Sequence, residues 1–469
     1  MSSKSDFDVI VVGGGLGGLS AASRAAQLGL KVAVLERGRE AQYLCNSRFS
    51  GGILHISQHN VEEPAEALVQ VIDEATLGQA DPALVKALAH DARRAVAWLR
   101  EEGAKYIRVG QIVWQQHVLA PPRPITPGLD WKGRGPDVTL RTLEANVVKR
   151  GGTVLRGTVA RALMEAAGAC VGVEADADGQ PLQFGANAVV IADGGYQANM
   201  DLIAEHITPA PAKVKQRGAA TGMGDGLRMA RAMGAAVTAL DAFYGHMLSR
   251  DSFHNDKVWP YPQLDELGTA GIVVDSRGER FTDEGMGGIY VANMIARLAD
   301  PLSTWAVFDE DVWNGPGKGA RIPANPNLVK AGGTVHQAPT LRALADTMGV
   351  PAERFELTVA AYNQALASGS LASLQPSRSS TRIPAMPIAK APYYAVPLCA
   401  GITYTMGGLA IDPDTRVQRQ GGGTLTGLYA VGAATGGLEG GSGIGYVGGL
   451  IKAATFGIRA AEAIARGRT

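Results

Sequence analysis

The stretch of residues 6–36 constrains the fold more than any other part of this chain. Residues 9–12 form an apolar, β-branched run of the buried-strand type. The run ends at three glycines with the G-x-G-x-x-G spacing: Gly13, Gly15 and Gly18. A helical pattern of small residues follows, and a second strand, residues 31–35, leads to Glu36. A strand, a glycine turn, a helix and a second strand in this order predict a β-α-β unit.

Each part of this unit has a physical role in binding a dinucleotide. Gly13 allows a tight turn, Gly15 lets the backbone approach a pyrophosphate, and Gly18 lets the helix and strand pack closely. The helix N-terminus offers free N–H groups and a partial positive charge to phosphates. Glu36 is placed to accept hydrogen bonds from ribose hydroxyls. The glycines alone would fit an ordinary turn, but with the flanking strands and the acid they predict a dinucleotide site.

Length, charge and cysteine content exclude several classes of function for this chain. The length of 469 residues indicates two or three domains. The 44 basic residues balance the 44 acidic ones, so the chain has no net charge that would favour binding to nucleic acid or to an anionic membrane. Residues 1–8 contain no apolar signal region, and no apolar run is long enough to cross a bilayer. The three cysteines form no C-x-x-C pair, which excludes a disulfide reductase and predicts a reducing, cytoplasmic location. No cluster has metal-ligand spacing, since the pair His55 and His59 lacks a third ligand.

The order of motifs along the chain predicts a divided domain. Strands and phosphate-type glycine turns occur at both ends, whereas aromatic residues and histidines appear from about residue 241. We expect a first part of a nucleotide-binding domain in residues 1–240, an inserted cap in residues 241–402, and the second part in residues 403–469.

Several ordered motifs together resemble a known family, the flavoprotein subunits of fumarate reductase and succinate dehydrogenase. The resemblance covers almost the whole chain and is closest to the tricarballylate-dehydrogenase-like and ketosteroid-dehydrogenase-like branch. It is carried by GGGLGGLSAASRAAQLG (13–29), NSRFSGG (46–52), VVIADGGY (189–196), TGMGDGLRMARAMGA (221–235), GERFTDE (278–284), TYTMGGLAID (403–412) and GLYAVG (427–432). It implies an α/β fold, in which a Rossmann-like two-part FAD-binding domain carries an inserted α+β capping domain.

The resemblance also implies which residues contact FAD. Asn46 stands where members with covalent flavin have a histidine, so we expect FAD to be bound non-covalently; a thioether to Cys45 is the alternative. Ala433 stands where the family has an acidic residue after the C-terminal strand, which removes one polar contact. The implied contacts are Gly13, Gly15, Leu16, Gly17, Gly18, Glu36, Arg37, Asn46, Ser47, Ser50, Gly51, Gly52, Val159, Ala192, Asp193, Gly194, Asp225, Gly408, Gly432, Ala433, Ser442, Gly443 and Ile444.

The catalytic positions depart from the fumarate reductase pattern. No arginine follows Glu284, where those enzymes have their proton donor, and Tyr404 replaces a substrate-binding histidine. The second carboxylate-binding arginine of the family aligns with Gly443. Because three charged groups that suit a dicarboxylate are absent, we do not expect fumarate to be the substrate.

Five side chains remain as candidates for the chemistry: Tyr404, His246, Tyr244, Tyr446 and Arg280. A tyrosine can donate a proton or hold a carbonyl oxygen, although Tyr404 could equally be a packed core residue. Tyr244 and His246 lie at the predicted entrance to the cap, where the family keeps a substrate histidine. Arg280 has a guanidinium that could bind a carboxylate, but a structural salt bridge suits its place in the GERF turn better.

These features favour an FAD-dependent oxidoreductase that acts on a carbon–carbon bond next to a carbonyl or carboxylate of a small molecule. Hydride would pass between one carbon and flavin N5 while a proton moves at the neighbouring carbon. Loss of the reductase arginine slightly favours dehydrogenation, with a separate protein as one option for the electron acceptor. An enone or acrylate reductase is the alternative, and a flavin-carrying electron-transfer subunit is the alternative from another class.

Overall fold

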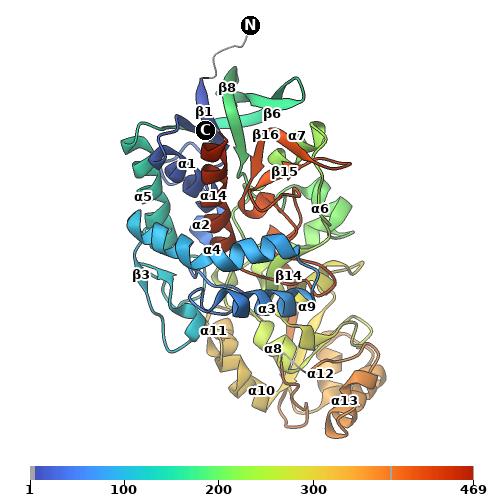
Figure 1. Ribbon diagram of the computed structural model, residues 1–469. Coiled ribbons are helices and arrows are strands. Elements are labelled where there is room, and N and C mark those ends of the chain that lie inside the picture. The colour runs from blue at the N-terminus through green and yellow to red at the C-terminus, as the bar shows by residue number, and fades with distance from the viewer. Residues whose placement is uncertain (1–5, 381–382, 468–469) are drawn as a thin grey trace.

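The computed structural model describes residues 6–380 and 383–467. Residues 1–5, most of the segment in which the sequence shows no apolar signal region, lie outside this description. The first and last parts of the chain lie together at one end of the molecule, and the middle part, yellow to orange in Figure 1, forms the other end. Among the described helices, none combines the length and apolar character needed to cross a bilayer.

A sheet of eight described strands organises the first end of the molecule, with the order β15-β16-β8-β1-β2-β5 along its main path. Its strands are β1 (Phe7–Val12), β2 (Val32–Glu36), β5 (Thr153–Arg156), β6 (Thr158–Ala166), β7 (Ala169–Ala177), β8 (Gln180–Ile191), β15 (Arg416–Gln418) and β16 (Thr424–Ala430). Strand β1 is parallel to both β2 and β8, and β16 is parallel to β8. This central position of β1 follows from its β-branched sequence, because such a strand is buried on both faces.

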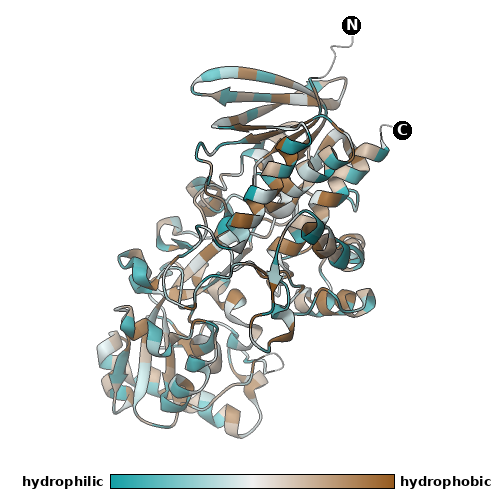
Figure 2. Ribbon diagram, turned by 90° about the vertical axis from the view of Figure 1, so that its left-hand side faces the viewer, coloured by the Kyte–Doolittle hydropathy of each residue, from teal (hydrophilic) through white to brown (hydrophobic). Residues whose placement is uncertain are grey.

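Helices surround this sheet, and the first of them begins directly after the glycine turn that follows β1. They are α1 (Leu16–Gln27), α2 (Asn46–Phe49), α3 (Ala65–Thr76), α4 (Pro82–Glu101), α5 (Gly135–Lys149), α6 (Met200–His206), α7 (Asp225–Ala232) and α14 (Gly449–Arg466). Helices α1 and α14, from opposite ends of the sequence, pack side by side (Figure 1). Gly457 allows this contact, since a Cβ there would lie 2.5 Å from the carbonyl oxygen of Gly17. The helices in Figure 2 carry both brown and teal residues, as amphipathic helices on a sheet do.

The middle part is built on a second sheet with the order β10-β14-β12-β11 along its main path. Its described strands are β9 (Lys215–Gln216), β10 (Phe243–Ser249), β11 (Ile272–Val274), β12 (Trp305–Asp309), β13 (His336–Ala338) and β14 (Tyr393–Thr405). The helices around it are α8 (Asp265–Ala270), α9 (Gly288–Ala296), α10 (Glu310–Asn314), α11 (Ala324–Lys330), α12 (Leu341–Met348) and α13 (Ala352–Ala367). A short hairpin of β3 (Tyr106–Ile107) and β4 (Val118–Leu119) lies apart from both sheets.

The fold class expected from the sequence is confirmed: mixed α/β sheets form a Rossmann-like FAD-binding domain with a capping domain. The exact division at residues 240 and 402 stays a prediction. Strand β14 runs through the second of these boundaries, and its C-terminal end pairs with β10 at Tyr404 and Thr405. This strand therefore carries side chains from the cap directly to the cavity between the two parts.

Candidate active site

One cavity of about 640 Å³ connects the glycine turn after β1 with the second sheet. Its walls come from the turn itself, from the loop around α2, from the C-terminal ends of β8 and β16, and from β10, β14 and the segment around Tyr261. A long cavity with a phosphate-type turn at one end and aromatic side chains at the other suits an extended dinucleotide and a small substrate.

The glycine turn has the geometry that a pyrophosphate needs. Gly13 has φ +105°, and a Cβ there would lie 2.6 Å from the carbonyl oxygen of Ala192. A Cβ on Gly18 would lie 2.0 Å from the carbonyl oxygen of Gly13, so α1 could not pack against the turn with any larger residue. Gly15 lines the cavity, where its nearest neighbour is the Ser47 hydroxyl. The turn therefore fits the close approach of a phosphate group.

Glu36 faces the cavity and also braces the turn. Its carboxylate accepts hydrogen bonds from the N–H of Gly14 at 2.8 Å and from the N–H of Gly38 at 2.7 Å. Burial raises the pKa of Glu36, and these two backbone bonds act against that rise. Ser47 adds a second brace, because its hydroxyl accepts from the N–H of Leu16 at 3.0 Å. Glu36, at the end of β2, thus stabilises the conformation of the glycine turn at the end of the cavity where a ribose is expected.

The loop around α2 contains the two side chains that decide how a flavin could be attached. Asn46 donates to the carbonyl of Thr403 at 2.7 Å and accepts from the N–H of Ala219 at 2.7 Å, so it ties this loop to β14. Cys45 lines the cavity, and burial raises its thiol pKa to about 11. A thiol that stays protonated is a weak nucleophile. Neither residue is therefore suited to form a covalent bond to flavin.

Asp193 follows the third parallel strand and lies in the cavity wall. One carboxylate oxygen accepts from the N–H of Gly226 at 2.7 Å, while the other has no hydrogen-bond partner. Burial, followed by the nearby charge of Asp225, raises the pKa of Asp193 to about 7. The residue therefore changes charge near neutral pH.

Most of the expected FAD contacts line the cavity, and a smaller group lies behind it. Those in the wall are Gly13, Gly15, Leu16, Gly17, Glu36, Arg37, Asn46, Ser47, Ser50, Gly51, Gly52, Val159, Ala192, Asp193, Gly194, Asp225, Gly432 and Ala433. Those outside the wall are Gly18, Gly408, Ser442, Gly443 and Ile444. Ser442 is exposed and bonds to Gln79, because the turn that carries it points away from the cavity.

Three tyrosines form the aromatic end of the cavity. Tyr244 stacks on Tyr446 with ring centroids 4.1 Å apart, and it lies 5.2 Å from the ring of Tyr404. Tyr244 and Tyr404 are register partners on the antiparallel strands β10 and β14, which explains why residues 160 positions apart meet. Burial raises the pKa of Tyr244 to about 12, and burial also raises the pKa values of Tyr404 and Tyr446 well above the ordinary value. All three are therefore neutral phenols near pH 7.

Tyr244 belongs to a chain of polar contacts that ends on Asp265. Its hydroxyl lies 3.0 Å from Nε2 of His246, and Nδ1 of His246 contacts the carboxylate of Asp265. Asp265 also accepts from the N–H of Met247 at 2.9 Å, which fixes its position at the start of α8. Burial lowers the pKa of His246, so the imidazole is neutral near pH 7. With Nδ1–H donating to Asp265, Nε2 can accept a proton from the tyrosine.

Tyr404 has a different partner. Its hydroxyl donates to both oxygens of Glu439, at 3.0 and 3.1 Å. Glu439 is itself paired with the buried Lys452, and it accepts from the N–H of Val447 at 3.0 Å. Lys452 is the main cause that lowers the pKa of Glu439 against the effect of burial. The Tyr404 hydroxyl is thus held by a permanently charged carboxylate, on the side of the ring where α14 begins.

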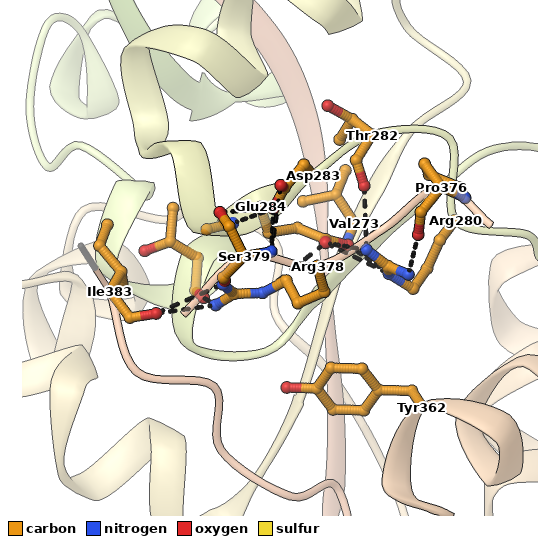
Figure 3. A network of polar contacts seen from close by, with 12 residues as sticks. Val273, Arg280, Thr282, Asp283, Glu284, Tyr362, Pro376, Arg378, Ser379 and Ile383 are labelled. Carbon is orange, nitrogen blue, oxygen red and sulfur yellow. Dashed lines mark hydrogen bonds and ion pairs between the residues drawn. The ribbon is translucent and has the colours of Figure 1, made fainter. Parts of the chain in front are cut away.

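Arg280 lies in the cap and not in the cavity wall. Figure 3 shows its guanidinium directed at Glu284, with Arg378 on the other side of the same carboxylate. Nη1 of Arg280 donates to the carbonyl of Pro376 at 2.8 Å, and Glu284 also accepts from the N–H of Val273 at 3.0 Å. This buried network fastens the GERF turn to β11. Arg280 therefore has no part in the proposed chemistry.

The sequence motifs did not reveal several charged residues of the site. Asp265, Glu439 and Lys452 complete the contacts of the tyrosines, and Arg123, Arg217 and Arg321 lie in the cavity wall. These residues come from separate loops and helices, and none belongs to a spaced motif of its own. Only the position of Arg217, four residues before the start of the TGMGDG motif at Thr221, was a local signal.

Comparison with known proteins places the chain in a family. The family model described as an FAD binding domain matches residues 8–445. A vinyl phenol reductase of Lactiplantibacillus plantarum is 25% identical, with 92% of this chain and 91% of that protein covered. A probable fumarate reductase of Shewanella frigidimarina is 27% identical, with 92% and 70% covered.

A solved structure agrees at the level of the fold. A 3-ketosteroid-Δ4-(5α)-dehydrogenase from Rhodococcus jostii superposes with a TM-score of 0.74 at 21% identity, covering 99% of this chain and 98% of that one. The glycine turn, the acid after β2 and the long cavity are the features that such a fold uses for FAD. The chain therefore belongs to the FAD binding domain family.

Proposed function

We propose that this protein is an FAD-dependent oxidoreductase that acts on a carbon–carbon bond next to a carbonyl or carboxylate group of a small molecule. The observation that carries this proposal is the chain Tyr244–His246–Asp265, which ends in the same cavity as the glycine turn. Such a reaction moves a hydride at one carbon and a proton at its neighbour, so it needs a redox cofactor and a proton-transferring group together.

FAD, when bound, supplies the hydride chemistry at N5 of its ring system. The residues of the glycine turn would hold its pyrophosphate, and Glu36 would accept hydrogen bonds from its ribose. Neutral Asn46 and the protonated Cys45 leave it without a covalent bond. The tyrosine-lined end of the cavity then excludes water from the reacting carbons, which strengthens every polar interaction there.

The proton moves through Tyr244. In dehydrogenation the tyrosine oxygen takes the substrate proton while its own proton passes to Nε2 of His246. Asp265 stabilises the imidazolium that forms, as in other histidine–carboxylate pairs. The lowered pKa of His246 keeps the imidazole neutral near pH 7, the state in which it can accept this proton. Tyr404 shapes the cavity floor, because its hydroxyl is held by Glu439.

Reduction of a carbon–carbon double bond is the second candidate. The two relatives described above are both reductases, which favours this direction. The same residues serve this direction with the proton path reversed, since forward and reverse reactions share one transition state. In dehydrogenation the electrons must pass on to a second redox partner, and in reduction they must come from one; we propose a separate protein or small molecule for that role.

Single-turnover flavin kinetics on Tyr244→Phe test the proposal. Loss of the hydroxyl should lower the rate of flavin reduction or reoxidation by roughly 100- to 10,000-fold, the usual effect of a lost acid–base group. Tyr404→Phe is the matched control, since it removes a hydroxyl from the facing strand position. It should cost about 1.5–3 kcal/mol of stability, the range for a hydrogen bond to a charged group, with a much smaller effect on rate. The larger rate loss in Tyr404→Phe would instead make Tyr404 the proton-transferring group.

A further inference from the structure

Three arginines from distant segments converge on one tyrosine in the cavity wall. The guanidinium carbon of Arg123 lies 4.2 Å from the ring centroid of Tyr261, and that of Arg217 lies 5.0 Å from it. Arg321, from the cap, donates to the backbone carbonyl of Arg123 at 3.5 Å. All four residues line the cavity. The three guanidinium groups therefore form one cationic cluster, built from both parts of the molecule.

Among the residues that the structure describes, no carboxylate is in direct contact with this cluster, although the charge of Asp130 acts on Arg123 from a distance. Arg123 and Arg217 are only 6% and 7% exposed. The hydrogen bonds of their guanidinium groups go to neutral oxygens: the carbonyl of Gly128 at 2.7 Å and the hydroxyl of Thr403 at 2.9 Å. Within the described part of the chain, no carboxylate forms an ion pair with any of the three arginines. Burying cations without an anion is costly, so the cluster is incomplete by itself.

Unused donors point to the kind of group that completes the cluster. Nε and Nη1 of Arg123, Nε of Arg217 and Nε of Arg321 are buried without a hydrogen-bond partner. Burial lowers the pKa values of Arg123 and Arg321, and the neighbouring arginine of each lowers them further. For Tyr261, burial acts to raise the pKa, but the three arginines together hold it below its ordinary value. The pKa values of Arg123, Arg321 and Tyr261 are thus all lowered in part by neighbouring positive charge.

The cluster lies at the substrate end of the cavity. Arg217 is near enough to Tyr244 and His246 for its charge to affect both side chains, and it bonds to the residue before Tyr404. The phosphate-binding turn belongs to the other sheet, at the far side of Asn46. An anion bound by these arginines would therefore belong to the substrate and not to the pyrophosphate of FAD.

We propose that Arg123, Arg217 and Arg321 form a carboxylate-binding subsite, and that the substrates of this protein are small carboxylic acids. This inference rests on the proposed function. Guanidinium groups bind carboxylates through paired N–H donors, which satisfies the unused nitrogens of the cluster. A carboxylate attached to the reacting carbons would also pass part of the developing negative charge to the arginines. These three arginines would take the role of the carboxylate-binding arginine whose position Gly443 occupies in this sequence.

Binding of unreactive ligands to the oxidised holoprotein tests the subsite without turnover. Flavin absorbance is titrated with 3-phenylpropanoate and with its primary amide, which differ only in the charged group, under conditions in which the flavin stays oxidised. The wild type should bind the acid at least about tenfold more tightly than the amide, as expected for hydrogen bonds to a charged group. Arg321→Gln should remove this preference, because it should weaken binding of the acid and leave binding of the amide unchanged. Arg277→Gln, an exposed arginine of the cap, is the matched control and should bind as the wild type does.

The opposite results would overturn the subsite. Equal binding of acid and amide by the wild type, or an unchanged preference in Arg321→Gln, would show that the cluster is structural. If Arg321→Gln fails to retain flavin, Arg321→Lys replaces it: the lysine keeps the charge but loses the paired donors, so the preference should fall only in part. Ultraviolet difference spectra of wild type and Tyr261→Phe at neutral pH add an independent criterion. A tyrosinate signal that disappears in Tyr261→Phe would identify Tyr261 as the anion of the cluster and overturn the proposal.

The outcome also separates this inference from the proposed function. Flavin oxidation or reduction by neutral ketones and amides, but not by acids, would overturn the subsite and leave the oxidoreductase function in place. Acid binding that needs Arg321, with no redox reaction by any acid, ketone or amide, would support the subsite and count against the proposed function.

Discussion

At the scale of single residues, identical side chains differ in role because their partners differ. Tyr244 and Tyr404 face each other across two strands, and both are buried phenols. The first contacts a neutral histidine that can take its proton, whereas the second donates to a charged carboxylate. Tyr404 is a candidate from the sequence because it replaces a substrate-binding histidine of the family that the chain resembles. The contacts favour Tyr244, since Glu439 and Lys452 are not adjacent to Tyr404 in the sequence and could not be foreseen.

The attachment of flavin is a residue-level prediction. The purified protein should release FAD into the supernatant on acid precipitation, because Asn46 is held by two backbone groups and burial raises the thiol pKa of Cys45 to about 11. Measuring flavin absorbance in supernatant and pellet is sufficient. A flavin that remained on the denatured pellet of the wild type, and was lost from the pellet of Cys45→Ser, would contradict the prediction and establish a thioether.

Asp193 makes a second prediction at this scale, on the dependence of stability on pH. Its pKa is about 7 in the folded protein without ligand, against an ordinary value of 3.8. Between these values the folded state binds a proton that the unfolded state has released, so the free energy of unfolding falls as pH rises from about 4 to 7. Denaturant unfolding of the apoprotein should show this slope. Asp193→Asn should reduce it, and an equal slope in both proteins would mean that Asp193 ionises normally.

At the scale of elements, the sequence predicted best what local pattern decides. The first strand and the helix after the glycine turn lie where their patterns indicate, as β1 and α1. Local capping likewise sets the start of α4, where Asp81 accepts from the N–H groups of Ala83 and Leu84. The long antiparallel ribbon β6–β7–β8 is not evident from local pattern, because its exposed half lacks a continuous apolar pattern.

The contact between α1 and α14 gives a prediction for an element pair. Gly457→Ala should destabilise the protein by about 1–3 kcal/mol, the usual cost of overpacking, because its Cβ would lie 2.5 Å from the carbonyl oxygen of Gly17. FAD retention should fall with it, since α1 begins at the phosphate-binding turn. Gly467→Ala, at the end of the same helix and with no atom closer than 3.6 Å, is the matched control. Equal denaturation midpoints for the two variants would contradict the tight helix contact.

At the scale of the whole molecule, the site exists because two sheets meet at one cavity. The first sheet supplies the glycine turn and Glu36, the second supplies Tyr244 and Tyr404, and the cap adds Arg321. The nucleotide-binding half of the cavity could be predicted because its residues lie close together in the sequence, at spacings that the backbone of a β-α-β unit requires. Of the substrate half, the sequence indicated Tyr244, His246, Tyr404 and Tyr446 as candidates. It did not indicate Arg123, Arg217, Tyr261 and Asp265, because the segments that carry them are brought together only by long-range packing.

The most direct measurement is an anaerobic mixing experiment on the purified holoprotein alone. Oxidised protein is mixed with saturated acids and ketones, and chemically reduced protein is mixed with their unsaturated counterparts, while the flavin absorbance is followed. The account predicts that at least one acid pair bleaches or restores the flavin at a rate compatible with turnover, of order 1 to 1000 per second, and that the product has gained or lost one carbon–carbon double bond. A flavin that responds to no member of the panel, and changes its redox state only when a second protein is added, would contradict the account and identify an electron-transfer subunit instead.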